Sequence, residues 1–127
     1  MNDPNWWKQA KGTKANNADH FQELVDAVAV DKLIVVDFFM PNCGYCVKFM
    51  PEWNRIVDDF TAKYGDAIQF LKVDGIAERY ISQRYNVQSY PTFILIEGGT
   101  NGDSFHAWRA NHRTYDGMKQ WIEGFVG

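Results

Sequence analysis

The run Leu33–Phe39, LIVVDFF, constrains the fold of this chain more than any other stretch. All of its residues but one are apolar, and most are β-branched or aromatic. Such a run is typical of a strand that is covered on both faces, as in a sheet that lies between two layers of helices. The sequence therefore predicts an α/β fold with a central sheet flanked by helices.

Helical and strand patterns alternate along the rest of the chain. The predicted helices span residues 19–29, 43–64, 77–85 and 115–126, and the predicted strands span residues 33–39, 68–73, 92–96 and 104–108. Asp19 is expected to cap the first helix and Gly65 to end the second, which Pro51 should kink. The order of elements predicts a parallel βαβ unit followed by an antiparallel hairpin, in three layers.

Length and charge limit the classes of protein to which the chain can belong. Its 127 residues suffice for one domain with one hydrophobic core, and we expect a monomer. The formal net charge is −3 and the basic residues form no cluster, so no nucleic-acid partner is expected. The apolar runs are too short to cross a bilayer, so no membrane partner is expected either.

Residues 1–17 differ from the rest because they are polar and rich in Asn and Lys. We expect them to form a loosely attached N-terminal extension, with the folded domain spanning residues 18–127. Trp6 and Trp7 are expected to hold this extension on the body as a packed segment without function. The extension lacks the apolar core of a signal peptide, which favours the cytoplasm if Met1 is the native start.

Cys43 and Cys46 are the only cysteines, and they fall where a buried strand gives way to a helix. A disulfide between them closes a loop too short to stabilise the fold much, which disfavours a purely structural bridge. Residues three apart on a helical turn have Cα atoms roughly 5–6 Å apart, as a disulfide requires. The helix N-terminus favours the thiolate of Cys43, and Cys46, one turn further in, should keep a higher pKa. This predicts an exposed nucleophile, Cys43, and a shielded resolving thiol, Cys46.

Metal sites are the competing interpretation of a cysteine pair. A zinc site needs four ligands, and the further candidates are His20, His106 and His112, which are poorly spaced. An iron–sulfur cluster would have to be shared by two chains, because one chain offers only two thiolates. We therefore expect neither a metal nor another cofactor.

Asp37 interrupts the apolar run six residues before Cys43, where an ionised carboxylate is costly to bury. Burial would raise its pKa, which suits a group that exchanges protons with Cys46 through a water molecule. A purely structural acid, or one at an exposed strand end, is the alternative. Lys72 lies on the next strand and either pairs with Asp37 or extends to the surface.

Tyr90-Pro91-Thr92 stands at the mouth of the strand predicted over residues 92–96. A cis bond before Pro91 would suit a loop that offers free backbone groups to an extended substrate segment. An ordinary trans proline that begins a strand fits the sequence equally well.

These motifs together resemble the thioredoxin superfamily, and more closely the catalytic domains of protein disulfide isomerases. The resemblance covers Asp19 to Phe125 and rests on stretches that match in order: IVVDFF, CGYC, FMPEW, FLKVD, YNVQSYPTFILI and a last helix carrying WI. It implies a thioredoxin fold, and it implies catalytic roles for Cys43, Cys46, Asp37, Lys72 and Arg113. Arg113, whose match requires a one-residue insertion, would swing towards the resolving cysteine. Substrate would rest on Tyr45, Tyr90 and a cis Pro91.

Three positions depart from the pattern of that family. Asn42 replaces the tryptophan that usually precedes the first cysteine, which alters the surface on which substrates rest. Tyr45 replaces the histidine of isomerases and the proline of thioredoxins, which favours an intermediate redox potential. Val47 replaces a lysine, so that the nearest positive charge is displaced to Lys48.

The predicted function is a thiol–disulfide oxidoreductase that forms, breaks or reshuffles disulfides in proteins. Its expected partners are protein substrates with thiols or disulfides, and either a recycling redox partner or glutathione. The alternatives are a cytosolic reductase of the thioredoxin kind and a chaperone module that binds polypeptides without turnover. The resemblance to isomerases favours the endoplasmic reticulum or the secretory lumen.

Overall fold

The strand predicted from LIVVDFF, β2 (Leu33–Phe39), is the central strand of a five-stranded sheet in the computed structural model, which describes residues 3–127. The other strands are β1 (Thr13–Lys14), β3 (Ile68–Asp74), β4 (Thr92–Glu97) and β5 (Phe105–Ala107). Their order across the sheet is β1-β3-β2-β4-β5. β3 pairs in parallel with β1 and β2, whereas β4 pairs antiparallel with β2 and β5. The predicted α/β class and mixed sheet are confirmed.

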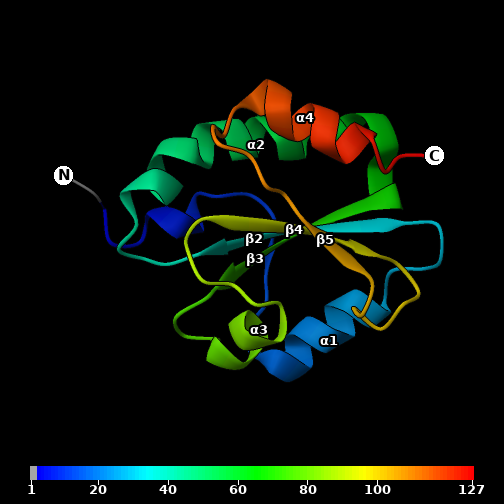
Figure 1. The fold of residues 1–127 in the computed structure, drawn as a ribbon, viewed down its shortest axis with the longest axis horizontal. Helices are drawn as coiled ribbons and strands as arrows, with labels where there is room; N and C mark the ends of the chain where they lie inside the picture. The colour runs from blue at the N-terminus through cyan, green and yellow to red at the C-terminus, as the bar shows by residue number, and fades with distance from the viewer. Residues whose placement is uncertain (1–2) are drawn as a thin grey trace.

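Helices cover both faces of this sheet (Figure 1). The helices are α1 (Ala18–Asp26), α2 (Gly44–Tyr64), α3 (Arg79–Arg84) and α4 (Tyr115–Glu123). α2 and α4 lie on one face, and α1 and α3 lie on the other. The side chains of β2 alternate between two hydrophobic cores: Val36 packs into the core that includes Phe21 of α1, and Val35 into the core that includes Trp53 of α2. Asp37 has the parity of Val35, so it lies on the α2 and α4 face.

Local signals set the ends of the helices. Asn17, rather than the predicted Asp19, caps α1, because its side chain accepts a hydrogen bond from the backbone amide of His20 at 2.7 Å. α2 ends where predicted, at Gly65, whose φ of 58° lies in the left-handed region that glycine adopts freely. Pro51 lies inside α2 as expected.

The N-terminal segment differs from the loosely attached extension that the sequence predicts. β1 extends the sheet by pairing with β3, and a short 3₁₀ turn, η1 (Trp6–Lys8), precedes it. The side chain of Trp6 is buried. The sheet thus begins before the predicted boundary between residues 17 and 18. Met1 lies outside the described residues.

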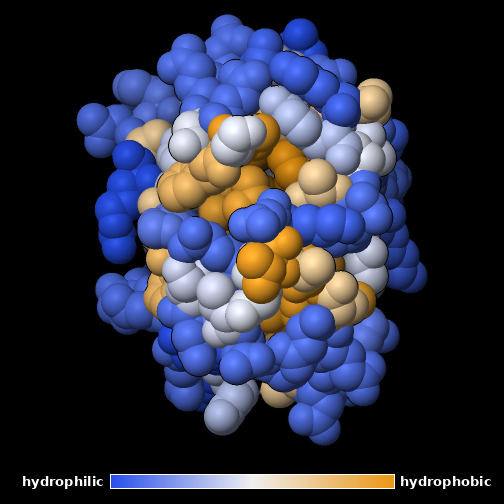
Figure 2. All heavy atoms as spheres, turned by 90° about the vertical axis from the view of Figure 1, so that its right-hand side faces the viewer, coloured by the Kyte–Doolittle hydropathy of each residue, from blue (hydrophilic) through white to orange (hydrophobic). Residues whose placement is uncertain are grey.

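The end of the sheet remote from Cys43 is hollowed. Figure 2 shows apolar side chains gathered there within a polar rim. The hollow has a volume of about 830 Å³, and its lining includes Val30, Leu33, Phe125 and Val126. Among residues 3–127, no helix combines the length and the apolar character that crossing a membrane requires.

Candidate active site

The two cysteines lie at the N-terminus of α2. Cys43 is the N-cap residue, and its Sγ accepts a hydrogen bond from the backbone amide of Cys46 at 3.1 Å. The two residues form a disulfide with their Cα atoms 5.2 Å apart, as the spacing predicts. An amide that donates to Sγ at a helix N-terminus also stabilises a thiolate at that atom.

The expected contrast in exposure between the two cysteines is absent. Each is 5% exposed, so neither sulfur stands out from the surface in the disulfide form. The reason is local packing, since both cysteines form one cluster with Trp6 and Phe39, against which Tyr90 also packs. What distinguishes Cys43 from Cys46 in this structure is therefore its capping position.

Asp37 is the one buried acid among residues 3–127, and it is 6% exposed. Burial raises the pKa of its carboxyl group to about 7, although the positive charge of Lys72 opposes the increase. Within residues 3–127, its Oδ1 atom has no hydrogen-bond partner. Because Asp37 is buried, the alternative that it lies at an exposed strand end is ruled out.

Lys72 is the register partner of Asp37 on the adjacent parallel strand. It is buried rather than extended to the surface, and burial lowers the pKa of its ammonium group. Its Nζ donates to the backbone carbonyls of Trp7 at 2.8 Å and Ala10 at 2.6 Å. Among the residues described, Lys72 and Asp37 form no ion pair within 4.0 Å. The strands bring the two residues side by side, but the ammonium is bound elsewhere.

The loop before β4 adopts the first of the two predicted conformations, because the Tyr90–Pro91 peptide is cis. The ring of Tyr90 lies over Gly75, where a Cβ atom would fall on the ring. In the described part of the chain, the backbone amide and carbonyl of Tyr90 form no hydrogen bond. They are therefore free to pair with another polypeptide segment.

Arg113 comes from the segment before α4, and Tyr45 comes from the first turn of α2. The guanidinium of Arg113 donates to the carbonyl of Pro91 at 2.9 Å, and not to a group at Cys46. Tyr45 is 74% exposed, and the ammonium of Lys48 lies 5.9 Å from the centre of its ring. Tyr45 and Arg113 line a common cavity of about 770 Å³.

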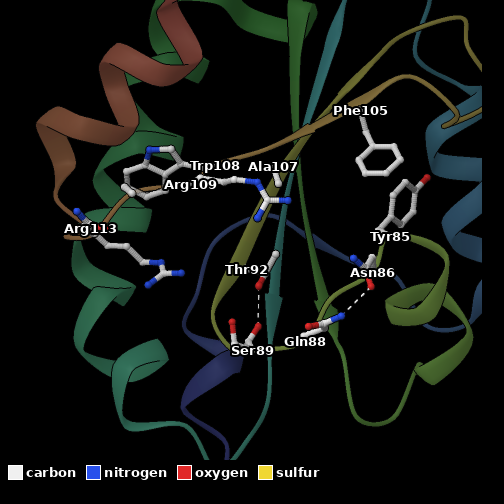
Figure 3. A pocket seen from close by; sticks show the side chains of 12 residues that line it. Tyr85, Asn86, Gln88, Ser89, Thr92, Phe105, Ala107, Trp108, Arg109 and Arg113 are labelled. Atoms are coloured by element: carbon white, nitrogen blue, oxygen red, sulfur yellow. Dashed lines mark hydrogen bonds between the residues drawn. The ribbon is translucent and has the colours of Figure 1, made fainter.

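A second cavity of about 540 Å³ adjoins the loop that carries Pro91 (Figure 3). Ser89 lines it from that loop, Thr92 from the start of β4, and Arg109 and Arg113 from the segment between β5 and α4. Its twelve lining residues include no Asp or Glu. The groove beside Pro91 is therefore positively charged, although the whole chain is acidic.

The N-terminal segment contributes contacts to the site that the sequence did not predict. Trp6 belongs to the same buried cluster as both cysteines, and the carbonyls of Trp7 and Ala10 hold Lys72. Two adjacent tryptophans in a polar stretch signal docking onto the body, but they do not indicate where. Within residues 3–127, no three side chains of His, Cys, Asp or Glu are arranged to hold a metal ion.

Comparisons with known proteins bear on the family and the fold of the chain. Residues 12–123 match the family model described as Thioredoxin. Protein disulfide-isomerase A4 of Bos taurus is 33% identical over 99 residues, which are 78% of this chain but only 15% of that protein. Thioredoxin-T of Drosophila melanogaster is 38% identical over 84 residues, which are 66% of this chain and 50% of the relative.

Solved structures show the same fold. The first thioredoxin domain of mouse protein disulfide-isomerase A4 superposes with a TM-score of 0.73 at 19% identity, over 93% of this chain and 81% of that one. The chain thus has the thioredoxin fold with a CxxC disulfide at the N-terminus of α2. It belongs to the thioredoxin family.

Proposed function

We propose that the chain is a thiol–disulfide oxidoreductase of the disulfide isomerase kind, which acts on dithiols and disulfides of other proteins. The observation that carries the proposal is the position of Cys43. Its Sγ caps α2, where it accepts the amide of Cys46 and is bonded to the sulfur of that residue. Such a sulfur is a good leaving group when the disulfide is reduced and a good nucleophile afterwards.

The exchange follows from the two sulfurs. In the reduced protein, the Cys43 thiolate attacks one sulfur of a substrate disulfide, and the other substrate sulfur leaves as a thiolate that takes up a proton. The resulting mixed disulfide is attacked by the Cys46 sulfur, which must first lose its proton. The substrate cysteine then leaves as a thiolate, so the substrate gains two electrons and the protein becomes oxidised. Oxidation of a substrate dithiol runs through the same steps in reverse.

Asp37 is the proposed acceptor of the Cys46 proton. Its pKa of about 7 makes it half ionised near neutral pH, where a base can both accept and return a proton. It lies on the face of β2 that α2 covers, and its Oδ1 has no partner among the described residues. Lys72 adjusts its charge, and Arg113 remains a proposed modulator of Cys46 that would have to leave the Pro91 carbonyl to reach it.

The proposed substrate groove runs along the loop that carries the cis peptide. The free backbone groups of Tyr90 would pair with an extended segment that contains the substrate cysteine. Tyr45 would form an exposed wall of the groove. Arg109 and Arg113, without a neighbouring carboxylate in their cavity, favour segments that carry Asp or Glu near the reacting cysteine.

Substitution of each cysteine tests the assigned roles. We expect Cys43→Ser to abolish reduction of insulin and refolding of scrambled ribonuclease, because it removes the nucleophile. Cys46→Ser should instead accumulate mixed disulfides, which mass spectrometry of the intact adduct detects. Equal accumulation of adducts by both variants would contradict the roles.

Two alternatives are separated by further measurements. A thioredoxin-like reductase has a more reducing dithiol than an isomerase, so equilibration of the Cys43–Cys46 pair with a glutathione buffer distinguishes them. A chaperone module would bind unfolded polypeptide but would lack both the insulin and the ribonuclease activity. The proposal includes a recycling redox partner or glutathione, and a location in the endoplasmic reticulum or the secretory lumen.

A further inference from the structure

Residues 6–11, here called the N-terminal strap, run from the loop before α2 to Trp53 in the middle of that helix; Figure 1 shows this segment in dark blue beside the start of α2. At one end, the indole Nε1 of Trp6 donates to the carbonyl of Pro41 at 2.8 Å, two residues before Cys43. At the other end, the indole of Trp53 donates to the carbonyl of Lys11 at 2.8 Å. The strap is thus fixed at both ends by tryptophan side chains, at one end beside the dithiol and at the other end in the middle of α2.

The middle of the strap binds the ammonium of Lys72. Two of the three donors of this group are taken by the carbonyls of Trp7 and Ala10, at 2.8 and 2.6 Å. Hydrogen bonds from a charged donor in a buried site are stronger than those between neutral groups. The two carbonyls therefore determine where the positive charge of Lys72 lies.

Without the strap, the same ammonium has another partner within reach. Asp37 and Lys72 are register partners on adjacent parallel strands, which lie roughly 4.8 Å apart, and their side chains project from the same face. Among the buried side-chain nitrogen and oxygen atoms of residues 3–127, only Oδ1 of Asp37 lacks a hydrogen-bond partner. A free Lys72 side chain would form a buried ion pair with it.

We propose that the N-terminal strap is a positioning element of the redox site, which holds the Lys72 ammonium on two backbone carbonyls and keeps it from pairing with Asp37. The inference rests on the proposed function only where Asp37 is taken as the proton acceptor of Cys46. It gives residues 6–11 a role in the chemistry beyond attachment of the chain end.

The groups that face Asp37 limit the ways in which its charge can change. β3 contributes Lys72, and β1 contributes Lys14, whose charge acts on Lys72. β4 contributes Phe93, which is uncharged. Cys43 and Cys46, at the N-terminus of α2, do not titrate while they are bonded to each other. In the oxidised protein, a change in the Asp37 pKa therefore reports on Lys72 or on the entry of water.

The test is a ¹³C NMR titration of the Asp37 carboxyl in the oxidised full chain, assigned with Asp37→Asn. Trp6→Ala removes the anchor to Pro41 and should free the strap. An opposite charge at ion-pair distance lowers a carboxyl pKa by about 1–3, so we expect the Asp37 pKa to fall by at least about one. Trp121→Ala removes a tryptophan of α4 that packs on Trp108 and Phe125, and it should leave the Asp37 pKa unchanged.

A double-mutant cycle decides whether the strap acts through Lys72. In a Lys72→Met background, Trp6→Ala should change the Asp37 pKa by less than about a third of its effect in the parent chain. An equal decrease in both backgrounds would mean that water reaches Asp37, and it would overturn the proposal. No decrease in the parent background would overturn it as well.

A second variant covers the case in which Trp6→Ala does not fold. Trp6→Phe keeps an aromatic ring against Phe39 but cannot donate to Pro41, and it should lower the Asp37 pKa in the same direction by a smaller amount. The titration uses no substrate, so it can succeed if exchange activity is absent. It can equally fail while exchange activity is present, which separates this proposal from the proposed function.

Discussion

Replacing Asp37 by asparagine should stabilise the protein, by an amount that grows with pH. The substitution keeps the shape of the side chain but removes a carboxylate that is almost fully buried. The folded-state pKa of this group is about 7, against an ordinary value of 3.8. A pKa difference of one corresponds to about 1.4 kcal/mol, so ionised Asp37 costs at most about 4 kcal/mol of the free energy of unfolding.

The sign follows from proton binding. Because the pKa is higher in the folded state, folded Asp37 holds a proton between about pH 4 and pH 7 while the unfolded chain has released it. The stability of the parent protein therefore falls as pH rises through this window. Asp37→Asn lacks this loss. The free energy of unfolding of Asp37→Asn should exceed that of the parent by close to zero below pH 4. This difference should grow by about 1.4 kcal/mol per pH unit and level off above pH 7.

Urea unfolding of both proteins from pH 3.5 to pH 8.5 measures this difference. Both must be kept oxidised, because free thiols would add titrations of their own. Asp66→Asn is the matched control: Asp66 is largely exposed and pairs with Lys32 at the surface, so its replacement should change stability by less than about 1 kcal/mol at any pH. If the two stability curves ran parallel over the whole range, the assignment of a buried, pKa-raised Asp37 would be wrong.

Two further predictions concern the substrate groove. Arg109→Ala should lower kcat/KM for disulfide peptides that carry Glu near the cysteine by about five- to tenfold, which corresponds to roughly 1 kcal/mol. Peptides that carry Gln at the same position should be almost unaffected. An equal loss for both peptides would exclude a charge preference in the cavity. Gly75→Ala should slow exchange with every peptide, because its Cβ would fall on the ring of Tyr90 and displace the loop that presents the Tyr90 backbone; unchanged insulin reduction by a folded Gly75→Ala protein would refute this role.

The sequence predicted the centre of the fold because the strongest signals are local. The run at β2 has the same bounds in the structure as in the prediction, since a strand buried on both faces is apolar throughout. The end of α2 is equally well marked, because Gly65 adopts a positive φ that other residues avoid. The dithiol could be predicted because the two cysteines, three positions apart, fall where the run of β2 ends and the helical pattern of α2 begins.

The remainder of the site depends on contacts that leave little trace in the sequence. β1 has two residues and exists only through pairing with β3, so Thr13 and Lys14 show no pattern of their own. The partners of Lys72 are backbone carbonyls, which every residue carries, and the letters at positions 7 and 10 therefore say nothing about them. The equal burial of the two cysteines also follows from distant packing, in this case by Trp6.

The stability lost at Asp37 and the chemistry proposed for it are two consequences of one environment. A carboxyl with a pKa of 3.8 would be ionised at neutral pH but would be a base about a thousandfold weaker towards a thiol, because its proton affinity falls with its pKa. Burial beside an ammonium that is bound elsewhere raises that affinity and, by the same amount, weakens the fold. Variants that relieve the cost by giving position 37 an uncharged side chain of similar shape, such as Asp37→Asn, should therefore gain stability at neutral pH and lose the rate at which Cys46 resolves mixed disulfides. Stability and resolution should move in opposite directions across such variants, whereas a purely structural acid would change stability alone.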